Sequence, residues 1–258
     1  MKTVLLTFDL EEFDIAQEYG QTVDFETKMR VSRQGMDKIL DLLAKYNIQS
    51  TIFCTACYAE NNPTQIKKIV DLGHELASHS YHHSSFKIED IELSKQKLEQ
   101  ISGKKIIGFR MPRLQKIDYQ HLINSKYEYD SSINPTYMPS RYNHLDKPRT
   151  IYSEQTKGFK IVPTSVTPLL RLPLFWLSFK NLPLWWFKIA SMRCLKSDGY
   201  LSLYFHPWEF CDLNGYGLPA YIRKIDDQKL LDRLERYIQF LLKNNCQFAS
   251  IEQFLKHH

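Results

Sequence analysis

Short apolar runs alternate with amphipathic segments along most of this 258-residue chain, and that alternation restricts the fold more than any other feature. A short run of β-branched and aromatic residues predicts a buried strand, whereas apolar residues at helical spacing predict a helix. Strands are expected at residues 3–8, 50–55, 75–77, 106–109, 127–130, 200–205 and 247–249, and helices at 28–46, 63–71, 89–101, 117–125 and 226–243. Repeated strand–helix units predict a parallel sheet, either closed as a barrel or covered by helices on both faces.

Two stretches interrupt this alternation. Residues 133–150 are rich in Pro, Asn and Tyr and predict a loop, while residues 156–167 predict a pair of strands that returns to the sheet. The length allows one large domain or two small ones. We expect one domain over residues 1–258, with an apolar excursion at about 165–197.

Within the excursion, residues 169–190 combine many large apolar side chains with prolines and charges, which makes them a poor membrane span. One interpretation is a buried helical hairpin. The other is an aromatic lid or interfacial patch, in which residues 169–187 contact a membrane or a lipid-linked substrate. The patch interpretation predicts that at least two of Trp176, Trp185 and Trp186 are partly exposed on the same rim as His206.

Composition restricts the partners and the compartment. The formal charge of +5 is small and no block of Lys and Arg occurs, which argues against nucleic acid as a partner. The first residues lack the charged, apolar and small-residue segments of a signal peptide. The chain has five cysteines, and this odd number agrees with a reducing compartment. We therefore expect a cytoplasmic protein and leave membrane association and oligomeric state open. Cys54 and Cys57 predict small buried side chains rather than half of a zinc knuckle.

Side chains capable of catalysis follow several of the predicted strands. They are Asp9 and Glu11 after the first, His79 and His83 beyond the third, Arg110 and Arg113 after the fourth, Asp130 at the fifth, and His206 and Trp208 after residues 200–205. The carboxyl ends of parallel strands meet at one rim, so these groups would lie close together.

The two histidines suggest a metal site. His79 and His83 stand four residues apart, and on one helical turn both imidazoles would face a single ion at roughly 2.0–2.1 Å. An extended chain through Asp9 and Glu11 puts both carboxylates on one side, which would supply a further ligand and a base. The pattern therefore predicts a hydrolytic metal site.

At these residues the chain resembles the polysaccharide deacetylase family, the carbohydrate esterases that include the chitooligosaccharide deacetylases. The resemblance extends over nearly the whole chain, in order, and its motifs are specific only in combination. The matching motifs are Thr7-Phe8-Asp9, His79-Ser80-Tyr81-His82-His83, Arg110-Met111-Pro112 and Leu203-Tyr204-Phe205-His206-Pro207. The resemblance implies a distorted or incomplete (β/α) barrel with about seven parallel strands.

Two positions depart from the commonest family pattern. Leu10 stands where a second, adjacent aspartate is usual, and the next carboxylate is Glu11, as in the branch with D-x-E spacing. Glu12 and Asp14 remain alternatives to Glu11 as the carboxylate ligand. Arg113 stands where a tyrosine usually follows the proline, which would change the pocket lining but not a backbone N–H.

The resemblance implies a divalent ion, Zn²⁺ first and Co²⁺, Mn²⁺, Fe²⁺ or Ni²⁺ as alternatives. The implied ligands are Glu11, His79 and His83. Asp9 would be the general base and Arg110 would keep it ionised.

The remaining implied roles concern the oxyanion, the leaving group and the sugar. The Arg113 amide would bind the oxyanion and His206 would protonate the departing amine. Trp208 and Tyr81 are candidates for substrate binding, with an exposed Trp208 face for a pyranose ring. Asp130 is a third candidate there, or else it caps a loop or positions His206.

These roles imply a hydrolase that removes N-acetyl groups from amino sugars in a polysaccharide, in peptidoglycan or in a lipid-linked saccharide. A cyclic-amide or ureide hydrolase on the same fold is the alternative enzyme. A catalytically degenerate member that binds a glycan without turnover is the alternative outside enzymes. Acetate release from N-acetylated sugars separates the three.

Overall fold

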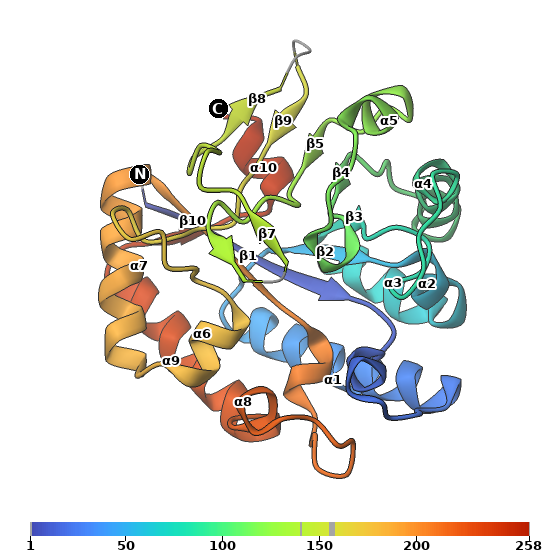
Figure 1. The fold of residues 1–258 in the computed structure, drawn as a ribbon, viewed down its shortest axis with the longest axis horizontal. Helices are drawn as coiled ribbons and strands as arrows, with labels where there is room; N and C mark the ends of the chain where they lie inside the picture. Colours follow the sequence, from blue (N-terminus) through green and yellow to red (C-terminus); the bar gives the residue numbers. More distant parts are fainter. Residues whose placement is uncertain (1, 140, 155–157, 258) are drawn as a thin grey trace.

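The computed structural model describes residues 2–139, 141–154 and 158–257, and its centre is a curled, mostly parallel sheet (Figure 1). In the described chain, six consecutive parallel pairings join seven strands in the order β10-β1-β2-β3-β4-β5-β9. Their bounds are β1 Thr3–Leu10, β2 Thr51–Cys54, β3 Glu75–Ser78, β4 Gly108–Phe109, β5 Tyr129–Asp130, β9 Lys160–Ile161 and β10 Tyr200–Phe205.

The curled sheet nearly closes on itself. The backbone N–H of Ser165, shortly after β9, donates to the Ser202 carbonyl of β10 at 2.9 Å. The Ser202 N–H donates in return to Ser165 Oγ, also at 2.9 Å. Helices surround the outside of the sheet (Figure 1). The fold is therefore an incomplete (β/α) barrel, and this confirms the expected architecture of about seven parallel strands.

β1 lies in the interior of the sheet because it pairs with three strands. It runs parallel to β10 on one side and, along its second half, to β2 on the other. β11 (Gln247–Phe248) pairs with the first residues of β1, at Thr3 and Val4. Every residue of β1 is buried, as expected for a central strand.

The helices that follow from the sequence pattern begin and end within a few residues of their expected bounds. They are α1 Phe25–Lys45, α3 Pro63–Asp71, α4 Asp90–Ser102, α5 Tyr119–Asn124 and α9 Asp227–Lys243. Asp24 caps α1 by accepting from the Thr27 N–H at 2.9 Å, and Gly103 ends α4 with a left-handed φ of 67°. Four further short elements are α2 Ala56–Asn61, α8 Ala220–Arg223, α10 Ile251–Leu255 and the 3₁₀ turn η1 Ile15–Tyr19.

α1 packs closely against η3 (Pro207–Phe210), the 3₁₀ turn that follows His206. Gly35 lies at the contact, and a Cβ added there would stand 1.8 Å from the Pro207 carbonyl oxygen. Only glycine allows the two backbones to approach this closely. The α1 helix thus fixes the position of the turn that carries His206.

The two interrupting stretches contain more structure than the sequence suggested. The expected loop at residues 133–150 includes a small antiparallel pair, β6 (Tyr137–Met138) and β7 (Tyr142–Asn143). The expected strand pair at 156–167 begins earlier: β8 (Tyr152–Ser153) pairs antiparallel with β9, while residues 156 and 157 lie outside the described residues.

The apolar excursion divides into buried and exposed parts. It forms α6 (Trp176–Asn181) and α7 (Leu184–Asp198), and Phe179 and Phe187 are fully buried against each other with ring centroids 5.0 Å apart. Leu169 is 94% exposed and Trp185 is 64% exposed. The segment is therefore neither a wholly buried hairpin nor a wholly superficial lid. No helix among the described residues is long and apolar enough to cross a membrane.

Candidate metal centre and active site

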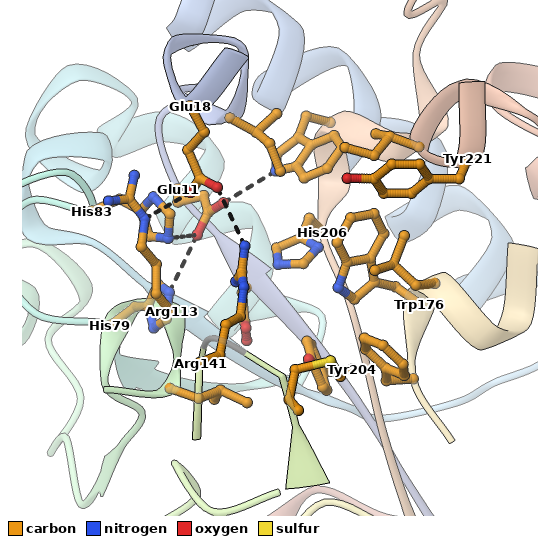
Figure 2. Close-up of a pocket in the computed structure, with 18 of the residues that line it drawn as sticks. Glu11, Glu18, His79, His83, Arg113, Arg141, Trp176, Tyr204, His206 and Tyr221 are labelled. Carbon is orange, nitrogen blue, oxygen red and sulfur yellow. Dashed lines mark hydrogen bonds and ion pairs between the residues drawn. The ribbon is translucent and has the colours of Figure 1, made fainter. Parts of the chain in front are cut away.

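The carboxyl ends of β1, β3 and β10 deliver polar side chains to one pocket of about 250 Å³. Asp9 and Glu11 line it from β1, His79 and His83 from the loop after β3, and His206 from the end of β10. Figure 2 shows Glu11, His79 and His83 grouped on one side of the pocket, with His206 and Trp176 on the other. The predicted convergence of strand ends is thus present in the structure.

Three potential ligand atoms face one another on the first side. Glu11 Oε2 lies 3.2 Å from His79 Nε2 and 3.0 Å from His83 Nε2. All three side chains are buried, and their ligand atoms lie within 4.8 Å of one another. Ligands bound to one tetrahedral ion at roughly 2.0–2.2 Å are separated by about 3.3–3.6 Å, so a small contraction or expansion of this cluster would fit Zn²⁺.

The partners of these three side chains also fit a metal ion. His79 Nδ1 donates to the Arg110 carbonyl and His83 Nδ1 donates to Asp14 Oδ1, each at 2.8 Å. These bonds turn the Nε2 atom of each imidazole toward Glu11 Oε2, the orientation in which Nε2 would serve as the ligand atom of a metal-bound histidine. Glu11 Oε1 accepts from Trp208 Nε1 at 3.1 Å, while the buried Oε2 makes no hydrogen bond of normal geometry with a described residue. Glu11 Oε2 is therefore the carboxylate oxygen that faces both imidazoles.

The charge state of Glu11 suits a ligand. Burial alone would raise the pKa of this carboxyl, but His83 and His79 outweigh burial and hold its pKa well below the usual range. The neighbouring carboxylates are engaged elsewhere: Asp14 accepts from His83, and Glu12 Oε2 accepts from Thr55 Oγ1 at 2.7 Å. Among the three carboxylates considered from the sequence, Glu11 is the one that faces both imidazoles.

The expected helical turn at residues 79–83 is wrong. These residues form a loop in which Ser80 has a left-handed φ of 66°. The loop is shaped by two bonds from the start of α2, Ala56 N–H to the Ser80 carbonyl and Cys57 N–H to the Tyr81 carbonyl, at 3.0 and 2.9 Å. The imidazoles of His79 and His83 still stack, with centroids 5.5 Å apart.

The candidate base is held by a buried arginine. Arg110 NH1 contacts Asp9 Oδ1 at 2.6 Å and Thr7 Oγ1 at 2.9 Å. Its remaining donors reach the carbonyl and hydroxyl of Ser131 at 3.0 and 2.9 Å, and its guanidinium lies 4.0 Å from the Phe53 ring centroid. Each of the three guanidinium nitrogens has a partner, so Arg110 can fix the orientation of the Asp9 carboxylate.

On the opposite side, His206 is enclosed by aromatic rings and anchored by a carboxylate. It stacks on Trp208 with centroids 5.0 Å apart, and the edge of Trp176 lies at 5.1 Å. Its Nδ1 lies 3.0 Å from Glu209 Oε1. Burial opposes protonation of His206, but the hydrogen bond that it donates to Glu209 and the nearby carboxylates Glu11 and Asp9 outweigh burial and raise its pKa.

A buried lysine completes this arrangement. Lys180 Nζ, on α6, lies 3.2 Å from Glu209 Oε2, and both side chains are fully buried. Burial lowers the pKa of Lys180, and Glu209 opposes that shift. The sequence reasoning missed Lys180, although a lysine next to large apolar residues such as Phe179 is a signal that a buried acid pairs with it.

The three residues predicted to contact substrate lie in different surroundings. Trp208 is fully buried, so it offers no exposed face to a pyranose ring, and it orients Glu11 instead. Tyr81 lies outside the pocket, with its hydroxyl donating to Glu60 Oε2 at 2.7 Å. Asp130 is buried and accepts the N–H of Ser132 at 3.0 Å, so it stabilises a loop, and the partner of His206 is Glu209.

The rim of tryptophans expected beside His206 is also wrong. Trp176 does line the pocket, but it is only 8% exposed. Trp185 is exposed and Trp186 partly so, yet neither lines this pocket. Aromatic packing around His206 and the exposed apolar surface are therefore separate parts of the excursion.

The outer wall of the pocket includes Glu18, Arg141 and Tyr221, which the sequence did not single out, beside Arg113. Arg113 Nε lies 3.0 Å from Glu18 Oε1, and Arg141 reaches Glu18 Oε2 at 3.3 Å. Tyr221, from α8, lines the same wall and shares a 2.7 Å hydroxyl contact with Tyr19. Arg113 has a left-handed φ of 58°, and its side chain occupies the pocket where the family usually has a tyrosine.

Fold and site together define a (β/α)-barrel protein with a Glu–His–His cluster and a buried Asp–Arg pair at the carboxyl ends of its strands. A sequence profile described as Polysaccharide deacetylase matches residues 1–131, half of the chain. The chain belongs to the polysaccharide deacetylase family.

Curated relatives match over shorter stretches. A peptidoglycan deacetylase of Helicobacter pylori is 30% identical over 108 residues, which cover 38% of this chain and 37% of that protein. A peptidoglycan-N-acetylmuramic acid deacetylase of Bacillus subtilis is 29% identical over 65 residues, a quarter of each protein. The matches thus span well under half of the length of these relatives.

Solved structures match over nearly the whole chain and support the fold. The Puue allantoinase covers 99% of this chain and 89% of its own, with a TM-score of 0.69 at 17% identity. A pseudoenzyme of the CE4 family from Bacillus anthracis covers 97% of this chain and 64% of its own, with a TM-score of 0.55 at 13% identity. The same fold therefore occurs in an enzyme of another class and in a protein described as a pseudoenzyme.

Proposed function

We propose that this protein is a metal-dependent hydrolase that removes N-acetyl groups from amino sugars within a glycan. The observation that carries the proposal is the placement of an Asp–Arg pair and a Glu-anchored histidine around the Glu11, His79 and His83 cluster, all facing one pocket. Membership of the polysaccharide deacetylase family supports the reaction class.

The ligands in this proposal are Glu11, His79 and His83, and the ion is Zn²⁺ first among divalent metals. A bound divalent ion would polarise the acetyl carbonyl and lower the pKa of a water molecule toward roughly 7. Asp9 accepts the proton of the attacking water, because Arg110 holds its carboxylate toward the pocket.

The Arg113 backbone N–H is the proposed donor to the oxyanion. His206 then protonates the departing amine. Its Nδ1 is engaged by Glu209, which leaves Nε2 as the nitrogen that can carry a proton to the leaving group. Acetate and a free amino sugar result.

The glycan enters between the arginines and the aromatic wall in this proposal. Arg113, Arg141 and Tyr221 line the described pocket, whereas Tyr81 and Asp130 do not, and we propose these three as the side chains nearest to substrate. Trp208 also lines the pocket, but it is fully buried beneath the surface that a sugar could reach. One domain over residues 1–258 would build the whole site, since its side chains come from both ends of the chain.

We also propose that the exposed part of the excursion contacts a membrane surface or a lipid-linked saccharide. Leu169, Leu170, Trp185 and Ile189 are exposed by 94%, 77%, 64% and 48%, and α7 adds the partly exposed cation Lys188. Exposed apolar side chains beside cations favour an anionic lipid interface.

Acetate release tests the function. The purified protein with added Zn²⁺ should release acetate from N-acetylglucosamine oligomers or peptidoglycan fragments, and Asp9→Asn should release none above background. Opening of a cyclic ureide without acetate release would favour the alternative enzyme, which the allantoinase fold similarity keeps in view. Saturable glycan binding without acetate from any substrate would contradict catalysis altogether.

A further inference from the structure

A second set of metal-ligand groups lies next to the first. Among the described residues, Glu12, Cys57 and His82 also bring a carboxylate oxygen, a thiol sulfur and an imidazole nitrogen within 4.8 Å of one another. We call Glu11, His79 and His83 the inner set and Glu12, Cys57 and His82 the outer set. The mechanism derived above uses no member of the outer set.

The chain produces two sets because neighbouring residues face opposite ways. Glu11 and Glu12 are consecutive after β1, and His82 and His83 are consecutive in the loop after β3. In both pairs one residue belongs to the inner set and its neighbour to the outer set. Cys57, in the first turn of α2, completes the outer set.

The outer geometry fits one ion. Glu12 Oε1 lies 3.6 Å from His82 Nδ1, within the separation of about 3.3–3.6 Å expected for two ligands of one tetrahedral ion. Thr55 Oγ1 donates to the other oxygen of Glu12 and fixes its carboxylate. The Cys57 N–H to Tyr81 carbonyl bond ties α2 to the loop that carries His82.

Exposure and ligand type indicate which ion could enter. Glu12 and Cys57 are each 7% exposed, whereas the His82 side chain is 45% exposed. The site is therefore open on one side, where water can be the fourth ligand. A thiolate with an imidazole and a carboxylate suits a borderline-soft ion such as Zn²⁺ or Co²⁺ better than Mg²⁺ or Ca²⁺.

We propose that Glu12, Cys57 and His82 bind a second divalent ion of the Zn²⁺ class, back to back with the inner set. This inference goes beyond the deacetylase activity and does not require it. On binding, the Cys57 S–H bond breaks, a sulfur–metal bond forms, and the proton leaves to solvent. The bound ion would tie Glu12 to His82 and so hold the loop that presents His79 and His83.

If the outer set binds no ion, its three side chains form a hydrogen-bond cluster. The experiment below separates these two possibilities.

Cobalt spectroscopy separates the two sets because only the outer set contains sulfur. Metal-stripped full-length protein titrated with Co²⁺ should bind two equivalents and develop a near-ultraviolet thiolate-to-cobalt charge-transfer band. Cys57→Ser should abolish the band and keep one equivalent. His79→Ala should keep the band and lose the other equivalent. His82→Ala, at a half-exposed position that the fold does not need, should weaken the band without unfolding the protein.

Cys54→Ser is the matched control, because Cys54 is a buried thiol outside the outer set whose Sγ donates to the Thr55 carbonyl, a bond that serine can keep. It should bind two equivalents and show the full band. In Cys57→Ser, the affinity of the inner set for Co²⁺ should fall by on the order of 10-fold, as happens when a group that supports a metal ligand is lost.

Wild-type protein that binds one equivalent without the band would overturn the second site and leave the inner site and the deacetylase proposal intact. A band that survives in Cys57→Ser would equally overturn it. A band without acetate release would leave the second site standing and refute the proposed activity.

Discussion

At the residue scale, the candidate metal centre depends on which of three neighbouring carboxylates faces the imidazoles. Glu11→Ala should abolish binding at the inner set, because two imidazoles alone leave too few ligands for a labile ion. Equilibrium dialysis of metal-stripped protein measures the loss as one equivalent of Zn²⁺. Asp14→Asn is the comparison: it keeps all three ligands but weakens the support of His83, so affinity should fall by about 10–100-fold. Equal loss in both variants would make Asp14 a ligand.

A second prediction at this scale separates the base from the metal. Asp9→Asn should retain the inner ion and lower acetate release by on the order of 10²–10⁴-fold, because an amide cannot accept the proton of water. Metal content measured on the same sample is the control. Retained activity would mean that another group, with the metal, removes the proton.

The pH dependence of activity should report the groups around His206. The charged or titratable groups near it are Asp9 and Glu11 from β1 and the chain after it, Tyr204 from β10, Glu209 from η3, and Lys180 from α6 through Glu209. His206 must be protonated to act as an acid. Its raised pKa keeps it protonated to higher pH, so activity should decline on the alkaline side as His206 loses its proton.

Two variants should move this alkaline limit in opposite directions. Glu209→Gln removes the main group that raises the pKa of His206, so the limit should shift to lower pH. Lys180→Met removes a cation that offsets Glu209, so the limit should shift to higher pH. NMR titration of the His206 imidazole checks both shifts without turnover. If Lys180→Met does not fold, the double variant with Glu209→Gln removes both charges, and its limit should also lie below that of the wild type.

At the element scale, the contact between α1 and η3 depends on one residue, Gly35. Gly35→Ala would place a methyl group 1.8 Å from the Pro207 carbonyl oxygen, so one backbone must move. We expect a loss of about 1–3 kcal/mol in the free energy of unfolding and a fall in kcat, because the displaced turn carries His206. Denaturant titration measures the first and acetate release the second. Gly103→Ala, where a Cβ meets open space, should cost only roughly 1–2 kcal/mol for its left-handed φ and leave kcat unchanged.

The exposed face of α7 gives the second prediction at this scale. Trp185→Ser with Ile189→Ser should reduce binding to anionic phosphatidylglycerol vesicles by roughly 30-fold, because each of the two apolar side chains contributes on the order of 1 kcal/mol when it is buried in lipid. Vesicle sedimentation measures the change. Leu93→Ser is the matched control, since Leu93 on α4 is as exposed as Ile189 but lies outside the excursion. No vesicle binding by the wild type would refute the membrane contact.

Local sequence patterns predicted helices and strands well where the spacing of apolar residues indicates which side chains are buried. The helix expected at 63–71 is α3, and the strand at 200–205 is β10, because apolar spacing and Pro63 act within a few residues. The helical turn at His79 and His83 failed because bonds from α2 shape that loop, and α2 lies more than twenty residues earlier in the chain. Spacing alone contains no information about such a partner.

At the scale of the whole molecule, the parallel sheet explains why the sequence alone predicts which residues meet at the strand ends. Asp9, His79, Arg110 and His206 converge because parallel strands end at one rim. The outer wall could not be anticipated, since Arg141 lies in a turn and Tyr221 in the four-residue helix α8, and both segments are too short to show a periodic pattern. Trp208 was misjudged because a tryptophan beside a catalytic histidine can equally face substrate or core. The one-domain organisation stays a prediction.

The pairing of β1 with β10 and β11 has a consequence for how the protein comes into being on the ribosome. β1 is translated long before β10 and β11, two of its three partner strands. Asp9 and Glu11 must therefore wait beside an unpaired strand edge, in a strand whose side chains are all buried in the folded protein, until these partners are made. The interval between the first strand and its partners is the period in which a nascent chain of this design is most exposed to aggregation, and the one in which a chaperone would act.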